Sequence, residues 1–345
     1  MPSVRLEGIT KAYGGKKALD HVSFTASGGR RTVIIGASGA GKTTILRLIA
    51  GFEAPDEGTL LIDEKDAAGI SPSARGIGMI FQDGALFPHS TVFENISYGL
   101  YRLGYQKEEI RRMTEETAEK LHIRDLLNRY PASLSAGERQ RTGIARALVR
   151  KPGLMLLDEP FANLDVRLKE ELLQEIISLQ EENGITMIHV THDQSEALAA
   201  AENLIVMEGG RILDAGDPER IINDPKDLKA AMFLGTPALN ILAAEVRDGR
   251  LHCFGRTFAV PTGFAGHVTA AVRPEHLYVS EDGIMCRVTG VVQRFADRIL
   301  ECESMYGAIR TLSAGNEQPG STIRLAFDEK DLMLFDAATG KRVRI

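Results

Sequence analysis

The stretch RTVIIGASGAGKTTILRLIAG, residues 31–51, decides how the first part of the chain folds. Its centre, GASGAGKT at residues 36–43, fits the pattern G-x-x-x-x-G-K-[ST] without a mismatch. An apolar run precedes this centre and a helical pattern follows it, which is the context that the motif requires. Glycines let the backbone curl until its N–H groups point inward at an anion. We therefore predict a cradle for phosphate groups, named here the phosphate loop.

Two side chains of the phosphate loop have expected chemical roles. Lys42 should reach the terminal phosphates of a nucleotide and act in catalysis, and the Thr43 hydroxyl should bind Mg²⁺. The alternative is an ordinary glycine-rich turn, which the complete motif in its required context disfavours. The residues expected to contact the nucleotide are Gly36, Ala37, Ser38, Gly39, Ala40, Gly41, Lys42, Thr43 and Thr44.

The segment LMLLDEP, residues 154–160, is expected to complete this site. Its four apolar residues predict a buried strand that ends at Asp158, where a carboxylate can hold the magnesium shell. Glu159 comes next, and a carboxylate at that place can orient and deprotonate an attacking water. A pair of residues that caps a helix is the alternative interpretation, and the complete phosphate loop weighs against it.

The pattern of residues 1 to about 235 predicts an α/β fold. Continuous apolar runs at 33–35, 154–157 and 186–190 end in polar residues, as strands buried on both faces of a parallel sheet do. Helical periodicity lies between them, at 107–121 and at 168–179. Residues 204–213 indicate a hairpin around Gly209 and Gly210. Chemistry in such sheets gathers at the carboxyl ends of the strands.

The pattern changes near Gly235, Thr236 and Pro237. From about residue 241, short alternating runs are separated by Gly, Asp and Pro, and helical periodicity almost disappears. This pattern predicts a second, small all-β domain that resembles a barrel. We expect one domain at 1–235 and another at 236–345.

Composition excludes several classes of protein. The 345 residues carry a net charge of −6, so there is no basic surface of the kind that binds nucleic acid. No apolar run approaches the roughly 18–20 residues that a membrane span needs, and the N-terminus lacks the apolar core of a signal peptide. Three late cysteines without CxxC spacing indicate small buried residues and no zinc site or disulfide frame.

A second segment, LSAGERQR at residues 134–141, also has the composition of an anion site. Ser135, a small residue and Gly137 stand at the predicted start of a helix, where N–H groups and a hydroxyl can face an anion. We call it the signature segment. The chain thus contains two cradles, and the sequence alone leaves open how both could serve one phosphate.

Several motifs together resemble the ATPase subunit of an ABC transporter. They are Tyr13, GASGAGKT, Gln82, LSAGERQ, LMLLDEP, the run Ala162 to Asp165, and His192, in the order and at the spacing of that family. The resemblance spans residues 4–235. It implies an ABC cassette of the P-loop NTPase type, with a helical subdomain at about 86–152 and a C-terminal domain of the TOBE type, similar to an oligonucleotide-binding fold.

The resemblance answers the question of the two cradles. In this family two ATPase domains pack head to tail, and each ATP lies between the phosphate loop of one subunit and the signature segment of the other. Ser135 and Gly137, with Glu138 beside them, would therefore contact the nucleotide of a second copy or a close paralogue. Asp165 would lie at the seam between the two copies.

The resemblance also implies roles for three other residues. Tyr13 would stack on adenine, although an exposed loop tyrosine is the alternative. Gln82 would contact Mg²⁺ and the attacking water and report to the membrane subunit. His192 would contact the γ-phosphate and help to hold Glu159. The signature segment departs from the common LSGGQ, since Ala136 replaces a glycine and Glu138 replaces the glutamine, which could weaken ATP-driven closure through charge repulsion.

The resemblance is strongest to bacterial importers, because the ATPase is a separate chain with an extra β domain. It implies two transmembrane permease subunits, an extracytoplasmic binding protein, and a place on the cytoplasmic face of the plasma membrane. The stretch AVRPEHL at residues 271–277 resembles the core of the TOBE domain, and FLGTPALNIL at residues 233–242 resembles the junction in sugar-importer ATPases. The resemblance therefore favours a sugar, oligosaccharide or sugar-alcohol cargo. Polyamine, ferric iron, sulfate and glycerol-phosphate importers remain alternatives.

Two other classes of function remain open. A soluble ABC-type ATPase that acts on nucleic acid or ribosomes should show coiled-coil insertions, two cassettes or a basic surface. A regulatory module that binds ATP without hydrolysing it should lack Lys42, Asp158, Glu159 or His192. The exposed apolar loop around Gln82–His89 instead predicts a docking site for a membrane partner, with local packing of the loop as the alternative.

Overall fold

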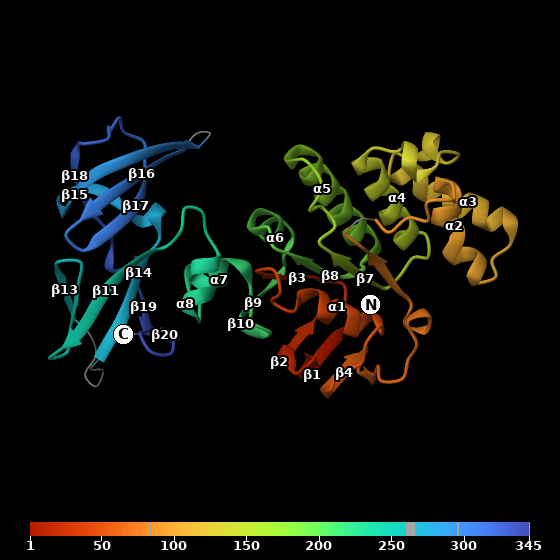
Figure 1. Cartoon of the computed structure of the whole chain (residues 1–345), viewed down its shortest axis with the longest axis horizontal. Coiled ribbons are helices and arrows are strands. Elements are labelled where there is room, and N and C mark those ends of the chain that lie inside the picture. The colour runs from red at the N-terminus through yellow and green to blue at the C-terminus, as the bar shows by residue number, and fades with distance from the viewer. Residues whose placement is uncertain (83, 260–265, 295–296, 345) are drawn as a thin grey trace. The chain divides into compact units, whose positions relative to one another are not determined.

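The structure is a computed structural model that describes residues 1–82, 84–259, 266–294 and 297–344. The chain forms two compact units, Met1–Pro218 and Glu219–Ile345, each with a core of its own (Figure 1). The second unit therefore begins before residue 236, where the composition of the sequence changes. A functional boundary at residues 235 and 236 stays a prediction.

A six-stranded sheet forms the centre of the first unit. Five of its strands run parallel and β10 is antiparallel, so the predicted α/β fold and the hairpin are both confirmed. The strands β3, β7 and β8 are almost fully buried because sheet faces on both sides are covered. In sheet order the strands are β10 (Arg211–Gly216), β9 (Asn203–Glu208), β3 (Arg31–Gly36), β8 (Thr186–Thr191), β7 (Leu154–Asp158) and β6 (Ile77–Ile80).

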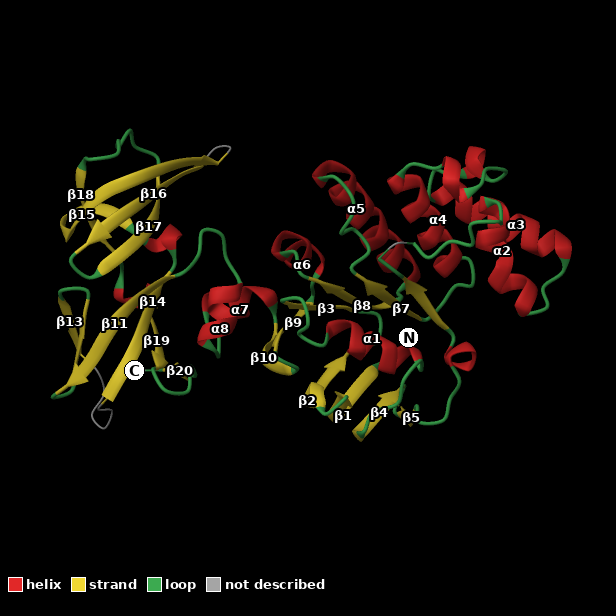
Figure 2. Ribbon diagram, viewed as in Figure 1, coloured by secondary structure: helices red, strands yellow, loops and turns green. Residues whose placement is uncertain are grey.

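A second, antiparallel sheet covers one side of this centre. It contains β2 (Lys16–Ala26), β1 (Val4–Tyr13), β4 (Glu57–Ile62) and β5 (Lys65–Asp66). The helix α1 (Lys42–Ala50) lies between the two sheets (Figure 2), and its apolar face joins side chains of both in one core. This packing fixes the direction in which α1 leaves the phosphate loop.

The remaining helices of the first unit are α2 (Val92–Arg102), α3 (Lys107–Lys120), α4 (Ala136–Leu148), α5 (Val166–Asn183) and α6 (Gln194–Ala200). The first three pack on one another, and together they occupy most of the predicted helical subdomain. On α5 the buried face consists of Leu172, Leu173, Ile176 and Ile177. Among the described residues, no helix is long and apolar enough to cross a membrane.

The second unit begins with two short helices, α7 (Pro218–Asn223) and α8 (Leu228–Phe233), and is otherwise built of strands. One sheet contains β13 (Arg256–Ala259), β12 (Arg250–Cys253), β11 (Asn240–Arg247), β14 (Gly266–Val272), β19 (Met333–Asp336) and β20 (Arg342–Val343). The other contains β17 (Gly307–Ser313), β16 (Asp297–Ser304), β15 (Tyr278–Arg294) and β18 (Thr322–Ala326). Both sheets contribute to a common core that includes Cys253, Cys286 and Cys302, all buried and unpaired.

Arg273 connects α7 and α8 to the strands of the second unit. Its side chain is buried, at 2% exposure, and burial lowers the pKa of its guanidinium below the usual range. The guanidinium donates hydrogen bonds to the carbonyl of Ile222 at 2.7 and 3.1 Å and to that of Leu234 at 3.0 Å. These carbonyls lie at the ends of the two helices, so one side chain satisfies acceptors that the helices leave open.

We predict that Arg273→Met lowers the free energy of unfolding of the second unit by roughly 2–4 kcal/mol, since it leaves two carbonyls without a donor. Arg344→Met is the matched control, because the Arg344 side chain is 78% exposed and pairs with Asp224 at the surface. It should cost less than about 1 kcal/mol. Urea unfolding of both variants measures the difference, and equal costs would contradict this role of Arg273.

Candidate active site

The phosphate loop joins β3 to α1, and two of its glycines are required by close packing. Gly41 has a φ of +97°, and a Cβ there would lie 2.5 Å from the carbonyl oxygen of Ala18. A Cβ on Gly36 would lie 2.3 Å from the carbonyl oxygen of Met207. No larger residue fits at either position without moving backbone, so the loop keeps the tight curve that turns its N–H groups inward.

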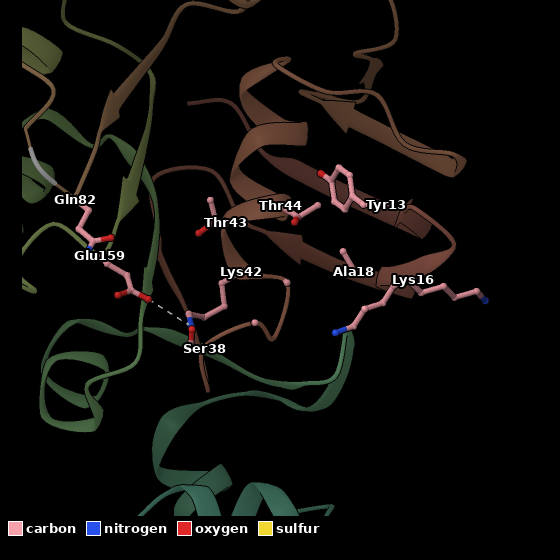
Figure 3. Close-up of a pocket in the computed structure, with 12 residues that line it drawn as sticks. Tyr13, Lys16, Ala18, Ser38, Lys42, Thr43, Thr44, Gln82 and Glu159 are labelled. Carbon is pink, nitrogen blue, oxygen red and sulfur yellow. Dashed lines mark ion pairs between the residues drawn. The ribbon is translucent and has the colours of Figure 1, made fainter.

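A cleft of about 570 Å³ opens beside the phosphate loop. Figure 3 shows Tyr13 on one side of the loop, with Gln82 and Glu159 on the other. Four separate segments that the sequence singled out, the phosphate loop among them, therefore meet at one cleft. The residues that line it are Tyr13, Lys16, Lys17, Ala18, Ser38, Gly39, Gly41, Lys42, Thr43, Thr44, Gln82 and Glu159.

Lys42 lies at the bottom of the cleft. Its ammonium group donates hydrogen bonds to the carbonyls of Gly36 at 2.8 Å and Ala37 at 3.1 Å, and it lies 3.5 Å from a carboxylate oxygen of Glu159. The side chain is only 4% exposed. The positive charge is thus held inside the curve of the loop, where a phosphate group would meet it.

Glu159 is held from two sides. One carboxylate oxygen faces Lys42, and the other lies 2.9 Å from Nδ1 of His192. The backbone of Glu159 has a φ of +44°, which few residues other than glycine adopt, and its N–H donates to the carbonyl of Val190 at 3.0 Å. Strained backbone of this kind concentrates at functional sites, and here it aims a carboxylate into the cleft.

Asp158 and Thr43 form the adjoining pair. The Thr43 hydroxyl donates to a carboxylate oxygen of Asp158 at 3.0 Å. Burial, and then the neighbouring charge of Glu159, raises the pKa of Asp158 above its usual range. Gln82 follows β6 and reaches the same cleft. The three side chains offer hydroxyl, carboxylate and amide oxygens, the donors that Mg²⁺ prefers.

Tyr13 closes the other end of the cleft from the last position of β1. Its ring is half exposed, its hydroxyl donates to Glu53, and the ammonium of Lys11 lies 5.7 Å from the ring centre. Burial and the bond to Glu53 raise the pKa of the phenol. The half-exposed ring lines the cleft and offers an aromatic surface on which a flat ligand can stack.

The signature segment begins α4, and its residues are absent from the lining of the cleft. Ser135 caps the helix, with its hydroxyl accepting the N–H of Glu138 at 3.3 Å. The Glu138 carboxylate accepts the N–H of Ser135 at 2.7 Å, and this bond lowers the pKa of Glu138. Glu138 therefore completes a capping box, which gives a local reason for an acidic residue at this position.

Two further expected residues also lie outside that lining. Gly137 is buried, and a Cβ on it would lie 2.6 Å from the side chain of Leu168 on α5. Asp165 caps α5 by accepting the N–H of Leu168 at 3.0 Å. The signature segment and Asp165 are thus packed together through Leu168, while the phosphate loop lies elsewhere in the same unit.

Sequence reasoning missed part of the cleft. Lys16, Lys17 and Ala18 belong to the hairpin between β1 and β2 and line the cleft beside Tyr13. Their only sequence signal is the glycine pair at residues 14 and 15, which predicts a turn that brings them back toward Tyr13. The capping box was readable, because Ser135 and Glu138 fit the S-x-x-E pattern.

We predict that Glu138→Ala lowers the free energy of unfolding of the first unit by about 1 kcal/mol at neutral pH. Glu138→Gln is the control, since an amide oxygen can accept the same N–H bond. Because the folded pKa of Glu138 lies below its ordinary 4.5, its contribution is complete above pH 4.5 and is lost as the pH falls through the folded pKa. Urea unfolding at several pH values would contradict the cap if the gap between wild type and the Ala variant did not shrink in acid.

Comparison with known proteins places the chain in a family. Residues 19–162 match the ABC transporter family. The chain is 38% identical to the sn-glycerol-3-phosphate import ATP-binding protein UgpC of Ruegeria sp. (strain TM1040) over 355 residues, covering 99% of each chain. It is 36% identical to the protein of the same name from Escherichia coli O1:K1 / APEC over 356 residues, covering 99% of this chain and 100% of the other.

Solved structures agree with this result. CbiO1 of Clostridium perfringens, part of the ABC transporter complex cbiONQ, aligns with a TM-score of 0.60 and 29% identity, over 66% of this chain and 92% of that one. The ATP-binding cassette MJ0796, solved as a dimer bound to ADP and Pi, aligns with a TM-score of 0.58 and 31% identity, over 62% of this chain and 98% of that one. The chain belongs to the ATP-binding subunits of ABC transporters, and it is the ATPase of an importer.

Proposed function

We propose that two copies of this chain hydrolyse ATP at their shared interface, with Glu159 as general base, and that hydrolysis drives the import of sn-glycerol 3-phosphate. The observation that carries the proposal is the position of the Glu159 carboxylate. It stands between Lys42 at 3.5 Å and His192 at 2.9 Å, at the edge of the phosphate loop. A base at this place can reach a water on the far side of the γ-phosphorus.

The reaction follows from these contacts. Glu159 accepts a proton from the water whose oxygen attacks the γ-phosphorus. The bond between the γ-phosphorus and its bridging oxygen breaks, and ADP and phosphate leave. Lys42 neutralises charge on the terminal phosphates once they replace the carbonyls of Gly36 and Ala37 as its partners. His192 orients the base and contacts the γ-phosphate.

Mg²⁺ fits the oxygen donors at the floor of the cleft. Thr43 and Asp158 already lie 3.0 Å apart, and Gln82 lines the same cleft. When bound there with the nucleotide, Mg²⁺ would supply positive charge that stabilises the terminal phosphates. Thr43 would bind it directly, Asp158 would hold its shell, and Gln82 would reach both the ion and the water.

The second cradle supports a head-to-tail dimer. Ser135, Gly137 and Glu138 lie outside the lining of their own chain's cleft, as does Asp165. A helix N-terminus that lies away from the cleft of its own chain is available to the nucleotide of a second copy. The related cassette MJ0796 was solved as a dimer bound to ADP and Pi. Ser135 and Gly137 would thus complete the site that the partner's phosphate loop begins.

The cargo assignment departs from the expectation of a sugar. The sequence alone favoured sugars, with glycerol phosphate as one alternative, whereas relatives at 36–38% identity over 99% of the chain are sn-glycerol-3-phosphate import proteins. An ATPase subunit does not itself bind cargo, so the cargo follows from the permease subunits with which it pairs. We therefore assign the chain to a glycerol-phosphate importer. Full-length similarity to import proteins also weighs against an ABC-type ATPase that is uncoupled from transport.

A docking surface for the two permease subunits is proposed around Gln82–His89. Phe87 is 41% exposed, and its ring lies 5.0 Å from Tyr98, itself 51% exposed. Asn95 of α2 anchors the loop by hydrogen bonds to both backbone groups of Phe87. Local packing thus explains where the loop lies, and a partner explains why two aromatic rings face outward. Asp83 lies outside the described residues.

The second unit is proposed to widen the dimer interface or to bind a regulator. Its exposed apolar side chains, including Val279, Met285 and Met305, favour a protein contact. The outer part of the transport system, an extracytoplasmic binding protein, would interact with the permease subunits and not with this chain. The place of the ATPase is then the cytoplasmic face of the membrane.

We predict that Glu159→Gln lowers kcat for ATP at least about 1000-fold, because an amide cannot accept the proton of water. Its affinity for ATP should stay near that of the wild type, and ATP should hold it as a stable dimer. Phosphate release and gel filtration with ATP measure both effects. Glu115→Gln on α3 is the control and should keep the wild-type kcat, since Glu115 pairs with Arg111 and Arg124 and is absent from the lining of the cleft. Hydrolysis by Glu159→Gln near the wild-type rate would overturn the assignment of the base.

The cargo is tested separately in the cells that encode this chain. After deletion of the chain, the wild type should restore uptake of radiolabelled sn-glycerol 3-phosphate, and Lys42→Ala should not, because it cannot hold the terminal phosphates. Uptake of a disaccharide should be the same in all three strains. Restoration of disaccharide uptake, with no change for the phosphate ester, would return the assignment to a sugar importer.

A further inference from the structure

His189 and Glu196 form a buried pair that the proposed chemistry does not use. His189 lies on β8 and is fully buried, and Glu196 lies on α6 with its side chain 4% exposed. Nε2 of His189 and a carboxylate oxygen of Glu196 are 2.6 Å apart. This separation is that of a close polar contact between the two buried side chains.

The pair is connected to the loop that carries His192. The second carboxylate oxygen of Glu196 accepts a hydrogen bond from the Thr191 hydroxyl at 3.1 Å. The same hydroxyl accepts the N–H of Asp193 at 3.0 Å. Both sequence neighbours of His192 are therefore linked to Glu196. Thr191 bonds to it directly, and Asp193 is linked to it through the Thr191 hydroxyl.

The loop is closed on itself by Asp193. Its carboxylate accepts the N–H of Glu196 at 3.1 Å and so caps α6, and it also forms an ion pair with Lys169 of α5. Residues 191–196 thus form a ring of hydrogen bonds with His192 pointing outward. His192 has a side chain that is 57% exposed, so buried packing of its own does not hold it in place.

His189 also touches the segment that carries the base. The ring of Phe161, two residues after Glu159, meets the His189 ring edge to face with centres 6.0 Å apart. The buried His189 ring therefore contacts Phe161, in the segment that carries Glu159, and Glu196, which holds the loop that carries His192. Glu159 and His192 in turn contact each other.

The stability of the fold does not account for this histidine. Within the described residues, neither ring nitrogen of His189 makes a hydrogen bond of good geometry, although Nε2 lies close to Glu196. A buried polar atom without a partner costs free energy, and an apolar residue on this central strand would avoid that cost. A group retained at such a cost is a candidate for a role beyond packing.

We propose that His189 and Glu196 are positioning residues for ATP hydrolysis, which hold the loop 191–193 so that His192 stays against Glu159. This inference rests on the proposed function, since it assumes that the contact between His192 and Glu159 aids the reaction. Loss of the pair lets the loop shift by a fraction of an ångström, and misplacement of a catalytic group on that scale lowers the rate.

The test uses the full chain with ATP and Mg²⁺ and measures kcat, KM and the ATP dissociation constant. His189→Leu should lower kcat roughly 10- to 100-fold and leave the dissociation constant within about two-fold. His189→Gln, which can still donate to Glu196, should restore most of kcat. In a His192→Ala background, His189→Leu should have no further effect, because the group that it positions is gone.

The outcomes separate this inference from the proposed function. If His192→Ala itself keeps full turnover, the assignment of the site fails. If His192→Ala is slow but His189→Leu is not, or if the two losses multiply, only the positioning role fails. Should His189→Leu not fold, Thr191→Val decides, because it cuts the link between Glu196 and the loop and leaves the pair in place. It should show the same non-additive loss of kcat, and an unchanged kcat would overturn the inference.

Discussion

Phosphate binding at the carboxyl edge of a parallel sheet is the constraint on which the first unit depends. The loop must curl tightly enough to turn its N–H groups inward, and this requires glycine where Gly36 approaches Met207 and Gly41 approaches Ala18. The curl in turn requires a helix that leaves in a fixed direction. The packing of α1 between two sheets provides that direction, and the same sheet brings β7 and β8 beside β3.

The acidic residues at that edge follow from the same arrangement. Asp158 ends β7 and Glu159 turns away from it with a positive φ, so that neighbouring carboxylates take different partners. One meets Thr43, and the other stands between Lys42 and His192. The two neighbouring carboxylates therefore have different proposed roles. Asp158 would hold the metal ion, and Glu159 would accept a proton from the water. The loop that carries His192 is in turn bonded, through Thr191, to the buried side chain of Glu196.

The sequence alone predicts much of the fold of the first unit and the part of the site around the phosphate loop. Local sequence pattern alone predicts three features: the phosphate loop, the strand before Asp158 and the hairpin at residues 204–213. What stayed hidden depends on contacts between distant segments. Lys16 has no motif, and only the folded hairpin brings it to the cleft. His189 fits no sequence motif, so nothing in the pattern separates it from an ordinary structural or surface residue. Its neighbour Glu196 lies on the following helix, and only the fold brings the two side chains together.

The central claim is that neither copy of the chain completes a site for ATP alone. It is tested most directly by mixing two inactive variants, Lys42→Ala and Ser135→Arg. In a mixed dimer, one of the two ATP sites carries both substitutions and the other site carries neither. The account therefore predicts that ATP hydrolysis returns on mixing, although each variant alone is inactive. No recovery in a mixture proven to contain mixed dimers, or full activity of Ser135→Arg by itself, would contradict it.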